Sequence, residues 1–202
     1  MSDKAFRRAI EEYIAREARP REKFGHQPRL CALAVQIGQG QSYDDDVVHA
    51  AAWFHDLGVF SGHRPESPSE LERWDNTAYA MKCAPDILES LGFPATKIPA
   101  VVEAIRTHQA AEEPATTEGV ILHDADILEQ LGAVGVLRTV CKVGRDTRFE
   151  TFTAAIRSLE VAVSKLPARI QTDTARVLAA PRVATLREFL AQVRREAGLL
   201  LH

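Results

Sequence analysis

Apolar residues recur every three or four positions along most of the chain, which is the spacing that places them on one face of an α-helix. Near the start, Phe6, Ile10 and Ile14 form one such stripe. The same pattern predicts helices over residues 4–18, 28–37, 44–56, 69–92, 98–108, 118–131, 133–140, 149–165 and 169–197, the last of them restarted at Pro181. Alternating β-branched segments bounded by turn residues do not occur, so a sheet is not expected. The predicted fold class is all-α.

Nothing along the chain separates two domains, since there is no internal repeat, low-complexity tract or change in composition. Its 202 residues are enough for a single hydrophobic core. We therefore predict one all-helical domain over residues 1–202, with a core at 20–145 and a C-terminal helical extension at 146–202. Segment 57–68 contains two glycines and two prolines, and either a substrate-binding lid or a flexible connection would explain it.

Composition and charge limit the binding partners and the cellular compartment that we expect for the protein. The formal net charge is −3, so no basic field favours binding to nucleic acid or to an anionic membrane. The N-terminal residues lack the apolar core of a signal peptide, and no apolar run approaches the roughly 18 residues of a membrane span. The three cysteines, Cys31, Cys83 and Cys141, are widely spaced and odd in number, which favours reduced thiols. We expect a cytoplasmic protein.

The first candidate functional residues are His55 and Asp56. This doublet ends an apolar helical run that starts near Val47. Burying two such side chains without partners would cost several kcal/mol. A divalent cation held by one imidazole nitrogen and one carboxylate oxygen would satisfy both. A single His-Asp pair is more often an ordinary surface feature at a helix end, so the rest of the chain decides between the two interpretations.

Three further segments accompany the doublet in a specific order. G-H-Q-P-R-L contains His26, A-I-R-T-H ends at His108, and I-L-H-D-A-D-I-L-E-Q-L-G-A-V-G-V-L-R contains Asp124 and Asp126. Together with W-F-H-D-L-G, this ordered set resembles the HD-domain superfamily of metal-dependent phosphohydrolases, whose pattern is H…HD…D. The last block is similar to the "DADRL" block of one small bacterial branch, and the match covers about residues 20–198. The resemblance implies an HD-type helical bundle.

The resemblance also implies a metal site, with His26, His55, Asp56 and Asp126 as ligands of one divalent ion. Two imidazoles and two carboxylates suit Mn²⁺, Mg²⁺, Co²⁺, Ni²⁺, Zn²⁺ or Fe²⁺. Four protein ligands leave room on a six-coordinate ion for water and a phosphate oxygen. The expected function is hydrolysis of a nucleotide or small phosphate ester by metal-activated water.

The two acidic residues of D-A-D compete for the fourth ligand position. They lie about 200° apart on a helix and cannot both face one point. Periodicity places Asp124 on the apolar stripe and therefore predicts that it is the buried one, whereas the resemblance assigns the ligand to Asp126. We follow the resemblance and keep Asp124 as a catalytic or capping neighbour. His123, in this second His-Asp doublet, is expected on the helix surface.

Other residues are candidates for contact with substrate. Asp56, His108 and Asp124 form the predicted catalytic set, and Arg29, one helical turn from His26, is the predicted phosphate-binding cation. His108 could contact phosphate, donate a proton to the leaving group or bind a second metal, and a helix-capping role would also explain it. His63, within the loop, is a weaker candidate for substrate contact.

Some features depart from other HD branches. Apolar Val59 and Phe60 stand where (p)ppGpp hydrolases and 5′-nucleotidases of those branches carry a carboxylate. Di-metal HD proteins need an additional histidine between the doublet and His108, and the stretch L-E-R-W-D-N-T supplies Asp75 and Asn76 but no histidine. One metal is therefore favoured, and a dinuclear site that uses Asp75 or Glu72 stays open.

Two alternative functions remain: an HD-type iron oxygenase or lyase acting on a small organic substrate, and a non-catalytic nucleotide-sensing module. The expected partner is a small phosphorylated substrate, a nucleotide included, rather than nucleic acid or membrane. A homodimer is left open.

Overall fold

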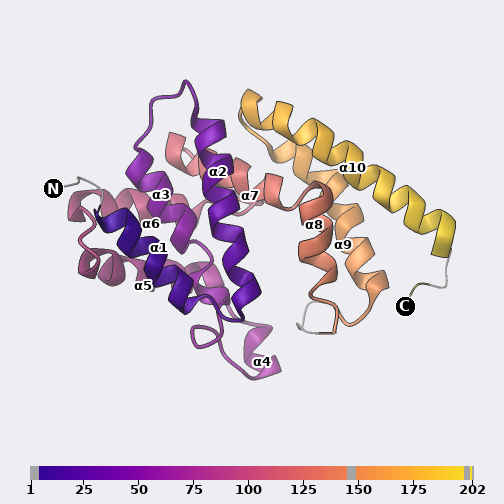
Figure 1. Cartoon of the computed structure of the whole chain (residues 1–202), viewed down its shortest axis with the longest axis horizontal. Helices are drawn as coiled ribbons and strands as arrows, with labels where there is room; N and C mark the ends of the chain where they lie inside the picture. The colour runs from indigo at the N-terminus through magenta and orange to yellow at the C-terminus, as the bar shows by residue number, and fades with distance from the viewer. Residues whose placement is uncertain (1–4, 145–148, 198–200, 202) are drawn as a thin grey trace. The chain divides into compact units, whose positions relative to one another are not determined.

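The computed structural model describes residues 5–144, 149–197 and 201 (Figure 1). In these residues the chain forms α-helices and short 3₁₀ helices, and the only β-type pairing is a single bridge between Ser61 and Arg64. The elements in order are α1 (Ala5–Glu17), η1 (Arg21–Gly25), α2 (His26–Gly38), α3 (Asp45–Phe54), η2 (Leu57–Val59), α4 (Pro68–Leu71), α5 (Asn76–Ser90), η3 (Ala95–Lys97), α6 (Ile98–Arg106), α7 (Thr117–Glu129), α8 (Gly132–Val140), α9 (Phe152–Lys165), η4 (Leu166–Arg169) and α10 (Asp173–Ala197). The all-α prediction is confirmed.

The chain divides into two compact units, residues 1–125 and 126–202, with the boundary inside α7. In the first unit, α3 packs against α1, α2 and α6, and α6 also packs against α5. In the second unit, α8, α9 and α10 pack against one another. The single-domain organisation, with its boundary at residue 145, stays a prediction.

Helix α3 is the centre of the first unit because it is almost entirely apolar after its first turn. Seven of its ten residues are buried, among them Val47, Trp53 and Phe54. A helix with so much apolar surface must be covered on most of its faces, which explains its helical neighbours α1, α2, α5 and α6. Each large side chain buried in this way contributes about 1.5–3 kcal/mol. The doublet therefore follows the most constrained helix of this unit.

In the second unit, α10 buries a stripe made of Ala175, Ala179, Leu186 and Leu190. The helix continues through Pro181, so the predicted restart at this residue is wrong. A proline removes one backbone hydrogen bond, but packing of the apolar stripe on either side holds the helix together.

The prediction of one continuous helix over residues 69–92 is also wrong, because two helices with a connection between them cover most of this range. Helix α4 ends at Leu71 and α5 begins at Asn76. Asp75 has an extended backbone and its side chain accepts a hydrogen bond from the Ala78 amide, which makes it the N-cap of a new helix. The break places Trp74 in a connection rather than on a helix.

In the part of the chain that the structure describes, no helix combines the length and apolar character needed to cross a membrane.

Candidate metal centre

The position of the His55–Asp56 doublet depends on how α3 is held at its start and at its end. At the start, the Asp44 side chain accepts hydrogen bonds from the amides of Asp46 and Val47 and so caps the helix. At the end, the His55 amide still donates to the Ala51 carbonyl at 2.9 Å. Asp56 then leaves the helix with φ −100° and ψ 16°. The two side chains therefore project from the last turn of a buried helix.

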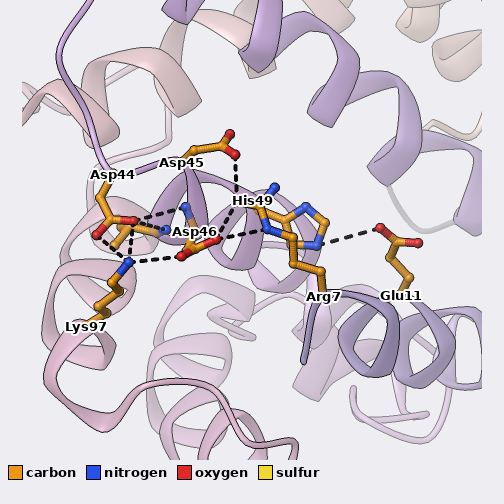
Figure 2. A network of polar contacts seen from close by, with 8 residues as sticks. Arg7, Glu11, Asp44, Asp45, Asp46, His49 and Lys97 are labelled. Atoms are coloured by element: carbon orange, nitrogen blue, oxygen red, sulfur yellow. Dashed lines mark hydrogen bonds and ion pairs between the residues drawn. The ribbon is translucent and has the colours of Figure 1, made fainter. Parts of the chain in front are cut away.

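A network of ion pairs anchors the opposite end of this helix (Figure 2). Arg7 of α1 donates to Asp45 at 2.6 Å and to Asp46, and Lys97 donates to Asp44 and to Asp46 at 2.9 Å. Burial alone would raise the pKa of Asp46, but the hydrogen bonds from Arg7 and Lys97 outweigh it and lower that pKa. The carboxylates at the start of α3 thus fasten it to α1 and to the segment that begins α6.

His26 is the first residue of α2, and its side chain is buried. Its Nε2 lies 3.1 Å from Nε2 of His55 and 3.6 Å from Oδ2 of Asp56, while His55 Nε2 lies 3.5 Å from the same carboxylate oxygen. One ligand atom of each residue lies within 4.8 Å of the others. Of the three side chains, that of Asp56 is the most open, at 21 % exposed. The fold brings three of the four predicted metal ligands together.

The orientation of His55 suits metal binding. Its Nδ1 lies 2.9 Å from the Ala52 carbonyl, which can only accept, so Nδ1 carries the proton. In the neutral ring, Nε2 then presents a lone pair toward His26. Backbone hydrogen bonds of this kind fix the tautomer of metal-binding histidines.

The spacing of the three donors also fits an ion. Two ligand atoms that each lie about 2.1 Å from a metal are separated by roughly 3.0 Å at a right angle and 3.4 Å at a tetrahedral angle. The observed separations are 3.1, 3.5 and 3.6 Å. With the proton of His55 on Nδ1, a neutral His26 can donate from Nε2 to Nε2 of His55 at this distance, and a cation bound by both nitrogens would replace that hydrogen bond. The group His26–His55–Asp56 can therefore hold a divalent cation.

His108 lies next to this group. It follows α6 directly, is buried, and donates from Nδ1 to the Ile105 carbonyl at 2.6 Å. Its ring centroid lies 5.0 Å from that of His55, and the His26 ring lies 5.1 Å from His55. The three imidazoles thus form a row with His55 in the middle. His108 is one of the predicted catalytic residues that the structure places beside the metal group.

The D-A-D segment lies on α7. Asp124 is fully buried and lies 3.2 Å from Nδ1 of His123, in agreement with its place on the apolar stripe. His123 is fully buried as well, so its expected surface position is wrong. The adjacent carboxylate lets a polar ring enter the core. Asp126 opens the second unit and accepts a hydrogen bond from Gln130 at 2.9 Å. The ligand role of Asp126 and the catalytic role of Asp124 stay predictions.

The remaining candidates for contact with substrate, Arg29 and His63, lie on different elements of the fold. Arg29 is exposed on α2, and its Nη1 lies so close to Gly25 that an added Cβ there would be 3.0 Å away. The guanidinium is therefore folded back toward the start of the helix that carries His26. His63, in contrast, bonds Tyr79 at 3.0 Å and Glu17 at 3.2 Å, which ties the loop to α5 and α1.

One contact near the doublet was not anticipated from the sequence. The indole N–H of Trp74 donates to the Gly58 carbonyl at 2.8 Å, only two residues after Asp56. A Cβ on Gly58 would lie 2.6 Å from the backbone oxygen of Asn76, so the turn and the start of α5 pack without a side chain between them. A glycine two residues after a metal-binding doublet is the signal that could have indicated this close approach.

Comparison with known proteins supports the same fold. No family model matches the chain. YpgQ of Bacillus subtilis is 26% identical over 179 residues, which cover 85% of this chain and 82% of YpgQ. The crystal structure of YpgQ in complex with ADP matches with a TM-score of 0.73 at 23% identity, over 96% of each chain.

Two further solved structures carry the superfamily's name. An HD-superfamily hydrolase from Bacillus thuringiensis matches with a TM-score of 0.67 at 20% identity, over 96% of this chain and 97% of that one. A predicted HD superfamily hydrolase from an uncultured Thermotogales bacterium matches with a TM-score of 0.63 at 23% identity, over 95% and 92%. The chain therefore has the fold of HD-superfamily hydrolases, which confirms the fold that the motifs imply.

Proposed function

We propose that the protein is a metal-dependent phosphohydrolase that acts on nucleotides or small phosphate esters. The observation that carries this proposal is the convergence of His26, His55 and Asp56, whose ligand atoms lie within 4.8 Å of one another at the end of a buried helix. Hydrolysis is the activity named for two of the proteins that share this fold.

A bound divalent ion would supply Lewis acidity, lowering the pKa of water and offsetting charge on a phosphoryl group. The rest of the proposed site consists of residues of this chain. Asp126 completes the ligand set. His108, with the proton on Nδ1, presents Nε2 next to the metal group, where it can contact phosphate or exchange a proton with the leaving group. Arg29 supplies positive charge for phosphate near His26.

A nucleotide is the preferred substrate class in this proposal, because the YpgQ structure with the same fold was solved in complex with ADP. A nucleotide offers a phosphate chain for the cation and for Arg29. It also offers an aromatic base that simple phosphate esters lack.

The test combines metal analysis with a substrate panel. We expect about one metal per chain, and release of phosphate or pyrophosphate from at least one nucleotide in the presence of Mn²⁺, Co²⁺, Ni²⁺ or Mg²⁺. His55→Ala and Asp56→Ala should lose both metal and activity while the far-ultraviolet circular dichroism spectrum stays helical, since neither side chain belongs to the apolar core. Hydrolysis retained by either variant would contradict the proposal. Two irons per chain with oxygen uptake and no phosphate release would indicate an oxygenase instead.

A further inference from the structure

The connection between α4 and α5 brings a large aromatic ring to the turn that follows the doublet. Trp74 lies in this connection, and its Nε1–H donates to the Gly58 carbonyl at 2.8 Å. Gly58 is separated from Asp56 by a single residue. The edge of the indole ring is therefore fastened to the backbone that carries the most open member of the metal group.

The backbone around Trp74 is fixed on both sides. On one side, the Trp74 amide donates to the Leu71 carbonyl at 3.2 Å. On the other side, the Asp75 side chain caps α5 by accepting from the Ala78 amide at 2.8 Å. The close packing of Gly58 against the backbone of Asn76 holds the start of α5 against η2. The position of the ring thus depends on several independent contacts.

Trp74 is the end of a series of aromatic rings along the loop. Its centroid lies 5.2 Å from Tyr79 with the planes at 46°, Tyr79 lies 5.7 Å from His63, and His63 lies 6.4 Å from Phe60. Phe60 is fully buried, whereas Trp74 is only half-buried. The series therefore starts in the core at Phe60, and the Trp74 ring at its other end keeps part of its area open to solvent.

We propose that Trp74 stacks against the base of a nucleotide bound at this site. This inference rests on the proposed function, because the metal group would hold the phosphates while Trp74 receives the base. A tryptophan with its N–H already bonded offers its π face for stacking, which tolerates different bases. Trp74 therefore favours nucleotides over phosphates that have no aromatic ring, without selecting one base.

Binding can be measured without turnover, because the chain contains only two tryptophans. Trp53, the other one, is buried in α3. Titration with ADP in the presence of Mg²⁺ should quench fluorescence in the wild type and in Trp53→Phe, but not in Trp74→Phe. Inorganic pyrophosphate, which has no ring, should cause no quenching.

Substitutions at Trp74 separate stacking from structure. Trp74→Leu should weaken ADP binding by about tenfold or more and leave pyrophosphate affinity and metal content nearly unchanged, while loss of the bond to Gly58 lowers the melting temperature of both Trp74 variants alike. Trp74→Phe keeps a ring and should lose less than Trp74→Leu. Equal weakening of ADP and pyrophosphate by Trp74→Leu, or no weakening of either, would overturn the proposal, as would wild-type protein that does not bind ADP.

Failure of the proposed function gives a different result. If the wild type released no phosphate from any nucleotide, but ADP still bound and depended on Trp74, the stacking role would stand and the hydrolase proposal would fall.

Discussion

At the residue scale, the row of three imidazoles assigns different tasks to chemically identical side chains. His26 and His55 place their Nε2 atoms 3.1 Å apart and 3.6 and 3.5 Å from one Asp56 oxygen. His108 is the outer ring next to His55, and it is not part of the group of three potential ligands found among the described residues. Its position suits contact with a substrate that binds at the ion.

This difference leads to a prediction for His108→Gln. We expect metal content to stay at the wild-type level and hydrolysis of a nucleotide to fall by about 10²–10⁴-fold, the range for loss of a general acid or base. Inductively coupled plasma mass spectrometry and steady-state kinetics are the measurements. His49→Gln, which changes a partly buried histidine in the middle of α3, is the matched control and should keep both. If His108→Gln lost the metal as well, His108 would be a ligand.

At the element scale, α3 connects two kinds of polar site. Its first turn carries the carboxylates that bond Arg7 and Lys97 (Figure 2). Its last turn leads into the doublet. His49 lies between them, with Nε2 3.7 Å from Glu11 of α1. Burial, together with the nearby positive charge of Arg7, lowers the pKa of His49 to about 4. The folded helix therefore holds His49 neutral.

A pH dependence of stability follows from this pKa. In the unfolded chain His49 titrates near 6.5, so between pH 6.5 and about 4 the unfolded state binds more protons than the folded state. The free energy of unfolding should be constant with respect to His49 above pH 6.5 and fall as the pH decreases to about 4. Urea unfolding at intervals between pH 7 and 4.5 is the measurement.

His49→Gln is the comparison that isolates this effect, since glutamine has no charge to gain. Its free energy of unfolding should vary less with pH over the same range. The lowered pKa of Asp46 affects stability only below its ordinary value of 3.8, outside this window. Parallel curves for the two proteins would show that His49 does not cause the dependence.

Helix periodicity predicted most of these elements, because the apolar stripes that define them are long and regular. It failed at residues 72–75, where the apolar pattern of Leu71, Trp74 and Ala78 continues but the chain does not stay helical. At these residues the chain instead makes two other hydrogen bonds, one from the Ala78 amide to Asp75 and one from Trp74 to Gly58. The first contact is local, between residues three apart, and competes directly with the helix, whereas the second joins segments 16 residues apart. Apolar periodicity includes neither of them.

At the scale of the whole molecule, the sequence again identifies residues of the site without revealing every contact between them. The order of motifs named His26, His55 and Asp56, and the fold brings them together although 28 residues separate the first two. Periodicity placed Asp124 in the core, as observed. The expectation that His123 lies on the helix surface was wrong, since it is fully buried with Nδ1 3.2 Å from Asp124. The pattern of apolar positions does not include such a contact between two polar side chains.

The last prediction concerns the fourth ligand, for which the D-A-D segment of α7 offers two carboxylates, Asp124 and Asp126. Asp124 is fully buried and bonded to His123, whereas Asp126 is partly exposed and bonded to Gln130. A partly exposed carboxylate loses less hydration when it exchanges a hydrogen bond for a cation than a fully buried one bonded to a histidine does, which favours Asp126 as the ligand.

We therefore expect Asp126→Asn to lower metal affinity at least tenfold, and Asp124→Asn to retain metal but unfold more easily. Competition of each variant with a metal-binding dye, together with thermal unfolding, measures both effects. Gln130→Ala is the control, because it removes the observed partner of Asp126 without touching the carboxylate, and it should leave metal affinity at or above the wild-type level. Loss of metal from Asp124→Asn but not from Asp126→Asn would reverse the assignment and make the buried carboxylate the ligand.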